Sequence, residues 1–180
     1  MTRRIKFILF LLLPALTSSL RAVQMDPLTI EAMAEQSALI LRGTVLSRTC
    51  LRDPVGRIYT KVELDVAEVW KGTLATNRFT VVHGGGILGE EKAVVSGQAE
   101  YEPGEEVVVF LVLNQRGEGV TRGLAQGKFH VWEDAGEQFA SNPFHGRKEN
   151  RGPAAKHNPA SDKPPLRLSE LKRRAQGGGQ

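Results

Sequence analysis

The stretch from Val81 to Glu90, VVHGGGILGE, is where residue types and spacing most suggest chemistry. A histidine and glycines after a strand can supply backbone N–H groups to an oxyanion hole, as in lipases and esterases of the α/β-hydrolase class. A hydrolase also needs a nucleophile. The glycine spacing of a nucleophile turn occurs at Gly123–Gly127, but Ala125 stands at its centre, and Ser96 lies in no such turn. We therefore expect the glycines to permit a tight turn with positive φ, with a small hydrolase using the His83–Gly86 loop as the alternative.

Residues that could hold a phosphate or a metal do not have the spacing that those ligands need. The glycines after His83 are not followed by the Lys-Ser or Lys-Thr pair of a phosphate-binding loop, and no helix is expected to begin there. The four histidines, His83, His130, His145 and His157, form no H-E-x-x-H motif, and the chain has no C-x-x-C pair. We therefore predict no catalytic residue, no cofactor and no bound metal.

The segments that must position these residues are typical of β-strands. In residues 57–72, RIYTKVELDVAEVWKG, apolar and polar positions alternate from Ile58 to Val66, so one face should be buried and the other exposed. Residues 106–113, EVVVFLVL, are apolar almost throughout and should be buried on both faces. Five or six strands are expected, with one short helix at 29–36 and no β-α-β spacing. This pattern predicts an all-β antiparallel barrel or sandwich.

The order of these segments resembles that of netrin-like domains, which include the tissue inhibitors of metalloproteinases. The shared features are a strand with a central glycine, a strand that begins with Tyr-Thr and ends in Lys-Gly, and a strand introduced by Gly-Glu. The matching positions are Tyr59, Thr60, Lys71, Gly72, Gly104 and Glu105. The resemblance implies an OB-like antiparallel barrel of five or six strands with one short N-terminal helix.

Two further motifs are similar to small exported bacterial proteins of unassigned function. They are GG-x-x-G at Gly85–Gly89 and QGKF-x-V at Gln126–Val131. One departure from the netrin-like pattern matters. The metalloproteinase inhibitors hold the protease zinc with a disulfide-bonded cysteine at the mature N-terminus, whereas the only cysteine here is Cys50. We therefore expect no inhibition by that mechanism and transfer no functional residue from the family.

Residues 1–22 have the features of an export signal. Arg3, Arg4 and Lys6 precede the apolar run 7–13, and small residues follow. The apolar run is shorter than the roughly 20 residues of a membrane-spanning helix. We therefore expect an exported protein, periplasmic or extracellular, whose mature chain begins near residue 23, with an uncleaved anchor as the alternative.

The charges of the remaining chain are unevenly distributed. Residues 23–144 contain 11 Lys and Arg against 17 Asp and Glu, whereas residues 145–180 contain 9 against 3. The acidic barrel region, 23–142, argues against nucleic-acid binding, because phosphate contacts need clustered cations. Residues 143–180 are rich in Pro, Gly and charge and predict a disordered basic tail with a short helix at 166–174. This tail could make weak contact with an anionic membrane or cell-wall polymer.

These patterns favour a non-catalytic binding or interaction module with an unknown protein or polysaccharide partner. Exposed aromatic side chains suit sugars and peptides, and OB-type barrels bind ligands on one face and the adjoining loops. The loops expected to contact the ligand are 53–57 and 84–97. The residues predicted to form this contact are Arg57, Tyr59, His83, Gly84, Gly85, Gly86 and Trp132.

Overall fold

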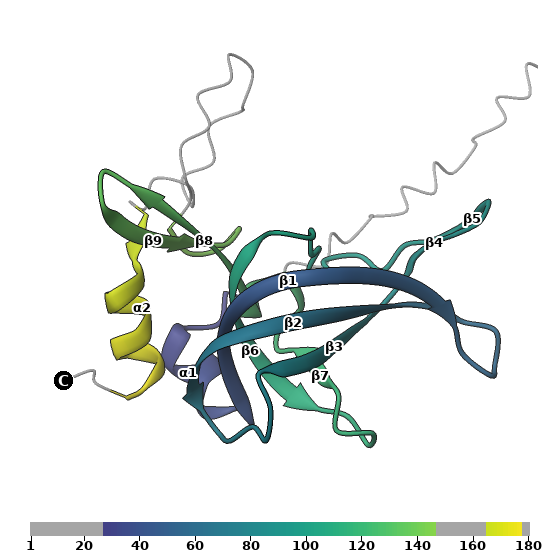
Figure 1. Cartoon of the computed structure of the whole chain (residues 1–180), viewed down its shortest axis with the longest axis horizontal. Helices are drawn as coiled ribbons and strands as arrows, with labels where there is room; N and C mark the ends of the chain where they lie inside the picture. The colour runs from purple at the N-terminus through teal and green to yellow at the C-terminus, as the bar shows by residue number, and fades with distance from the viewer. Residues whose placement is uncertain (1–26, 147–164, 178–180) are drawn as a thin grey trace, which may run out of the picture.

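Strands dominate the computed structural model, which describes residues 27–146 and 165–177 (Figure 1). The predicted export signal, residues 1–22, lies outside the described residues. The elements up to residue 93 are α1 (Ile30–Glu35), β1 (Leu39–Arg52), β2 (Ile58–Lys71), β3 (Arg78–Gly84), β4 (Gly86–Leu88) and β5 (Glu91–Ala93). The later elements are β6 (Glu106–Leu113), β7 (Gly119–Thr121), a 3-10 helix (Leu124–Gly127), β8 (Lys128–Asp134), β9 (Glu137–Ser141), β10 (Leu166–Arg167) and α2 (Leu168–Ala175).

Five strands close into a barrel in the order β1-β2-β3-β7-β6, and β6 pairs back onto β1. The prediction of an all-β barrel preceded by a short helix is confirmed. One pair differs from the expected antiparallel pattern, since β3 and β7 run parallel at Val81↔Gly119. The reason is geometric. Strand directions can alternate around a closed ring only when the number of strands is even, so a ring of five must contain a parallel pair.

The alternation predicted for β2 sets which side chains fill the barrel. Thr60, Val62 and Leu64 are buried, and their neighbours along the strand are not. Gly43 marks the place where β1 bends from β2 toward β6. A Cβ atom there would lie 2.3 Å from the carbonyl oxygen of Asp65, so only glycine lets the two strands approach this closely. The register of β1 against β2 shifts at the same point.

Besides the side chains that fill the barrel, a separate hydrophobic cluster lies outside it, between its outer wall and the helices. It contains Phe110 and Phe129, whose ring centroids are 5.7 Å apart, together with Ile30 and Met33 of α1. Thr29 begins α1 as its N-cap, because its hydroxyl accepts a hydrogen bond from Ala32 N at 3.1 Å. The described residues contain no helix that is long and apolar enough to span a membrane.

The segment 165–177 differs from the disordered tail expected for residues 143–180, because it folds onto the domain. β10 pairs with β9, and α2 follows it directly, so the short helix predicted at 166–174 is present (Figure 1). The predicted domain boundary at residue 142 does not hold for this segment. Residues 147–164 and 178–180 of the expected tail lie outside the described residues.

Burial explains why α2 is ordered. Leu168, Leu171 and Ala175 all pack into the cluster that contains α1. A helix this short is marginal in water, so its stability must come from the packing of its apolar face. Two ion pairs add to this contact, Lys172 Nζ to Glu68 Oε2 and Arg174 Nε to Glu31 Oε1, each at 2.6 Å. The pKa of the Glu68 carboxyl is lowered to about 2, mainly by the hydrogen bond from Lys172.

Candidate functional site

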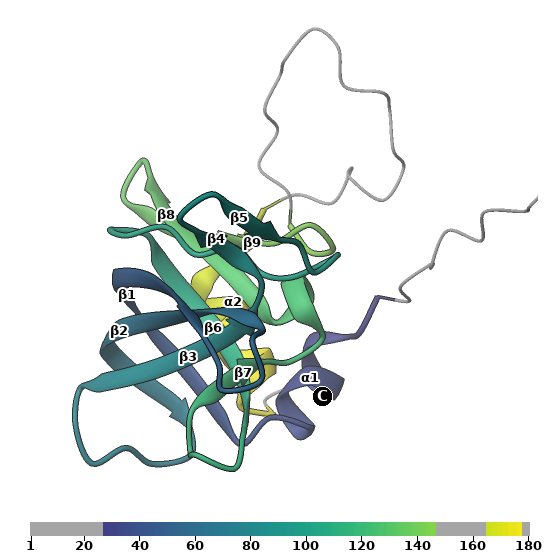
Figure 2. The same cartoon turned by 90° about the vertical axis from the view of Figure 1, so that its right-hand side faces the viewer.

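An open cleft of about 1190 Å³ lies at the end of the barrel opposite the two helices. Figure 2 views the molecule from this end, where the β1–β2 turn, the β4–β5 hairpin and the end of β3 come together. The cleft is lined by residues 52–59, 82–85, 91–93, 95, 98, 114–116 and 120. It is therefore built by turns and strand ends that are far apart in the sequence.

Five of the seven residues predicted to contact a ligand line this cleft: Arg57, Tyr59, His83, Gly84 and Gly85. Gly86 lies next to them and has a structural role. A Cβ atom at Gly86 would lie 2.6 Å from both Cys50 Sγ and Thr60 Oγ1, and its φ is +140°. The structure thus brings the two predicted loops together at one place.

Trp132 is not part of the cleft. It lies on β8, with its ring stacked between His130 and Phe139 at centroid distances of 5.9 Å each. β8 and β9 extend the sheet beyond the closed barrel, on the side of α2 (Figure 1). Trp132 was predicted to bind a ligand because exposed aromatic rings suit ligands. The residue type does not indicate where in the fold the ring lies.

The β1–β2 turn is held by a single carboxylate. Asp53 Oδ1 accepts hydrogen bonds from Val55 N at 3.0 Å and Arg57 N at 2.8 Å, and Oδ2 accepts one from Arg57 Nε at 2.8 Å. These bonds, led by the backbone N–H of Arg57, lower the pKa of the Asp53 carboxyl. Arg52 Nη1 closes the turn from the other side by donating to Gly56 O at 2.9 Å. The turn therefore presents Val55 and Arg57 in a fixed arrangement.

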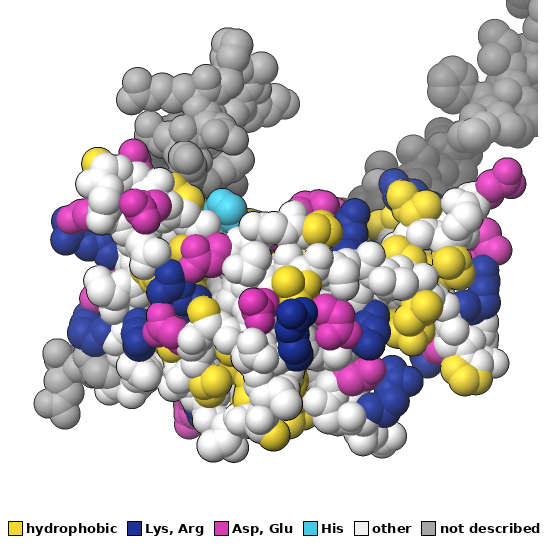
Figure 3. All heavy atoms as spheres, viewed as in Figure 1, with side chains coloured by type: hydrophobic (Ala, Val, Ile, Leu, Met, Phe, Trp, Pro, Cys, Tyr) yellow, Lys and Arg dark blue, Asp and Glu magenta, His cyan; other side chains and the backbone are white. Residues whose placement is uncertain are grey.

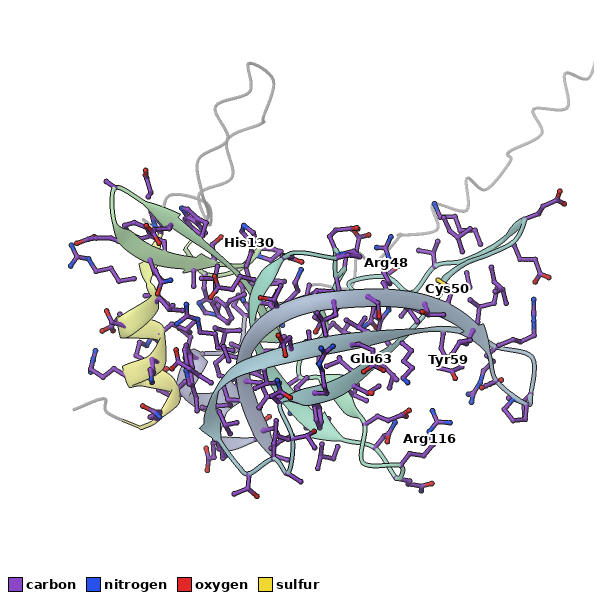
Figure 4. The ribbon with its side chains drawn as sticks, viewed as in Figure 1. Arg48, Cys50, Tyr59, Glu63, Arg116 and His130 are labelled. Carbon is purple, nitrogen blue, oxygen red and sulfur yellow. The ribbon has the colours of Figure 1, made fainter. Side chains whose placement is uncertain are left out.

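The β6–β7 turn, which also lines the cleft, has the same design. Asn114 Oδ1 accepts hydrogen bonds from Arg116 N at 2.8 Å and Glu118 N at 3.1 Å. Arg116 Nε donates to Glu118 Oε2 at 2.8 Å, and its guanidinium lies 6.0 Å from the centroid of the Tyr59 ring (Figure 4). The pKa of the Glu118 carboxyl is lowered, first of all by the amide of Asn114.

Sequence reasoning missed Arg116, because the segment from Asn114 to Gly117, NQRG, by itself indicates only a turn. A signal is nevertheless present. The chain contains two turns of the form Asx-x-x-Gly, DPVG at 53–56 and NQRG at 114–117, each carrying an arginine in or directly after it. In the structure both turns line the same cleft.

His83 lies at the inner side of the cleft and stacks on Tyr101, with ring centroids 6.1 Å apart. Its Nδ1 donates to the carbonyl oxygen of Gly84 at 3.1 Å, because a carbonyl can only accept. Nε2 is then the unprotonated nitrogen, and this buried atom has no hydrogen-bond partner among the described residues. Burial lowers the pKa of His83 and favours the neutral ring.

Among the described residues, His83 is not paired with a hydroxyl or thiol that it could activate. If His83 activated a nucleophile, a hydroxyl or thiol would lie within hydrogen-bonding distance of Nε2 of His83. In the described part of the chain, no such group bonds to Nε2. Those residues also contain no group of three or more His, Cys, Asp or Glu side chains that could hold a metal ion.

The surface of the cleft combines exposed apolar side chains with charged side chains that are mostly ion-paired. Val55 and Val95 are 74% and 44% exposed, and Ile87 and Val94 beside them are also exposed. Figure 3 shows hydrophobic side chains gathered at this end of the molecule. The charged lining residues are Arg52, Arg57, Lys92, Arg116, Asp53 and Glu91. Arg52 pairs with Glu91, Arg57 with Asp53 and Arg116 with Glu118, so most of these charges are matched within the chain.

The fold and the site together define a β-barrel with an open cleft between two rigid turns. No protein-family model matches the chain, and no curated protein matches it. The geometry of the cleft is therefore the basis for assigning a function.

Proposed function

We propose that the protein is an exported binding module that holds part of a protein or polysaccharide partner in the cleft between the β1–β2 and β6–β7 turns. One observation supports this proposal most strongly: an open cleft whose walls are preformed by side-chain hydrogen bonds from Asp53 and Asn114. A preformed site loses little conformational entropy when a ligand binds. OB-type barrels use the corresponding region, the strand 2–3 face and its flanking loops, for their ligands.

Export and the netrin-like resemblance belong to the same proposal. The sequence features of residues 1–22 favour a periplasmic or extracellular location. A five-stranded barrel behind a short helix is the architecture that the resemblance implies, and it agrees with a role in binding. The hydrolase alternative has less support, since Nε2 of His83 has no nucleophile beside it among the described residues.

A contact between the C-terminal residues and an anionic polymer has weaker support than the sequence suggested. Within 165–177, Arg167, Lys172, Arg173 and Arg174 each form an ion pair with a carboxylate of the chain. These four cations are partly neutralised in the folded protein and are less available to an external surface.

A matched pair of substitutions tests the proposal. Val95 lines the cleft, whereas Val69 lies on β2 outside it and is exposed to nearly the same extent, 44% against 41%. The mature chain, residues 23–180, would be used as bait in an extracytoplasmic extract. We expect Val95→Asp to weaken capture of the partner about tenfold or more, because a carboxylate placed in an apolar contact must be desolvated.

Val69→Asp should capture the partner as the unsubstituted protein does, with both variants checked for folding by circular dichroism. Equal capture by both variants would show that the partner binds elsewhere on the molecule and would contradict the proposal.

A further inference from the structure

We infer that the protein has a second binding surface, the border of β1 that faces away from β2 over residues 47–52, and that an extended, uncharged segment of another polypeptide pairs with it. This border is called the β1 edge below. The inference goes beyond the cleft and does not depend on it. It is supported by backbone groups without partners, by side chains that leave the edge exposed, and by charges that are already matched.

β1 has strands on both sides over its first part and on one side over its last part. β6 pairs with residues 39–44, and this contact ends at Val45, whose backbone bonds to Gly104 N and Glu105 O at 2.7 and 2.9 Å. Over residues 47–52, β1 pairs with β2. Among the described residues, no strand pairs with this part of β1 on its other side. The β1 edge is therefore about as long as a usual strand.

The turn after β1 shows which backbone groups point to this edge. Asp53 N donates to Arg57 O at 2.9 Å, so the backbone of Asp53 faces the β2 side. In an antiparallel pair this direction alternates from residue to residue. Arg48, Cys50 and Arg52 therefore direct N–H and C=O to the β1 edge, where those groups have no hydrogen-bond partner in the described part of the chain (Figure 4). An added peptide strand gains affinity from such main-chain groups.

The neighbouring hairpin β4–β5 covers a face of β1 and not its edge. Cys50 lies opposite Thr60 of β2, whose side chain is buried inside the barrel, so the Cys50 side chain points to the inner face of the sheet. Gly86 of β4 packs on that face, since a Cβ atom there would lie 2.6 Å from Cys50 Sγ. Thr49 and Leu51 lie on the outer face and are exposed. A further strand can thus approach the edge from the side.

The charges beside the edge are matched within the chain. Arg48 Nη1 donates to Glu102 Oε1 at 2.7 Å, and Arg52 Nη2 donates to Glu91 Oε1 at 2.8 Å. An acidic segment would gain little from arginines that are already paired. On the outer face, the side chains of an added strand would lie beside a threonine and a leucine, which suit β-branched and aliphatic neighbours. The ligand that fits is therefore an uncharged segment rich in Val, Ile or Thr.

A second copy of the chain fits this edge less well than another polypeptide does. In the antiparallel register that uses all three edge-directed residues, Cys50 would face Cys50 of the other copy. Each Arg48 would then face Arg52 of the other copy on the same side of the sheet. Like charges directly opposite each other destabilise a strand pair.

The experiment selects peptides for the β1 edge. Phage-displayed random peptides of about nine residues, long enough to form a strand, are depleted on Cys50→Pro and then selected on the mature chain, residues 23–180. Proline removes the central N–H of the edge and is tolerated on edge strands. We expect enriched peptides with alternating Val, Ile or Thr and no net charge. Cys50→Ser keeps the N–H and should bind them as the parent does. Recovery of no peptide would overturn the inference.

Amide hydrogen exchange tests whether the edge is free and whether the peptide covers it. In the free chain, the amides of Thr49 and Leu51 face β2 and should exchange slowly, whereas those of Arg48, Cys50 and Arg52 should exchange fast. An enriched peptide should slow exchange at these last three about tenfold or more. Slow exchange at all five amides in the free chain would show that the edge is already covered. If that protection rose with protein concentration, the occupant would be a second copy, and either result would overturn the inference.

Backbone pairing is tested with an enriched peptide that is N-methylated at alternate residues. Methylation in one register should weaken binding about tenfold, because it removes N–H donors that face β1, and methylation in the other register should not. Val95→Asp, which alters the cleft, should bind the peptide as the parent does. Equal effects of both registers, or loss of binding by Val95→Asp, would contradict pairing with β1. Neither result would contradict the cleft as a binding site, so the two proposals can fail separately.

Discussion

At the scale of single residues, the glycines after β3 shape the cleft by allowing close contacts. Gly86 has a φ of +140° and no room for a side chain, since Cys50 Sγ and Thr60 Oγ1 would each lie 2.6 Å from its Cβ. Thr60 Oγ1 also donates to Gly85 O at 2.7 Å, which fixes the backbone between β3 and β4. The positive φ expected for these glycines is present at Gly85 and Gly86, but the tight turn is not, because the chain passes from β3 into β4 and turns only at residues 89–90.

Substitution of this glycine gives a direct test. Gly86→Ala should lower the free energy of unfolding by about 2–4 kcal/mol, since it adds both backbone strain and a steric overlap. Gly89→Ala is the matched control, because Gly89 has a φ of +62° and a Cβ atom there would meet nothing within 4 Å. Its cost should be only about 1–2 kcal/mol from the left-handed conformation. Urea denaturation of both variants measures the difference, and equal losses would contradict the role given to Cys50 and Thr60.

At the scale of elements, local patterns predicted some strands well and gave no information on how they associate. The strands predicted from the period of two in β2 and from the apolar run in β6 are both present, because both patterns depend on which faces of a strand are buried. The parallel β3–β7 pair was not predictable in this way, since direction is set by closure of the ring. The joint position of Tyr59 and Arg116 also depends on that closure, which brings two distant turns together.

The helix α2 shows the same limit. Its two leucines indicated a short helix, but no local feature indicated that they fill a groove beside α1 and Trp70. Leu171→Ala should therefore lower the free energy of unfolding by about 2–5 kcal/mol, because Leu171 is fully buried. Arg173→Ala, at a side chain 50% exposed, should change it by less than about 0.5 kcal/mol. Thermal denaturation of both variants checks this, and a negligible effect of Leu171→Ala would show that α2 is not docked.

At the scale of the whole molecule, the distribution of charge separates two ends with different roles. At one end, cations of α2 pair with carboxylates of β2 and α1, Lys172 with Glu68 and Arg174 with Glu31. At the other end, aliphatic residues are exposed around the cleft, and three of its four cations pair with Glu91, Asp53 and Glu118 (Figure 3). Composition alone showed an acidic domain with a basic tail, and the folded arrangement shows that cations of this tail pair with carboxylates of the domain.

The most direct test of the central claim is to map the bound partner on the folded chain by NMR. Amide chemical shifts of the mature protein would be recorded with and without the captured partner. We predict that the largest shifts fall on residues 53–59, 82–85 and 114–117, with little change in β8, β9 or α2. Shifts centred on Trp132 and the β8–β9 hairpin, with the two turns unaffected, would contradict the assignment of the cleft as the binding site.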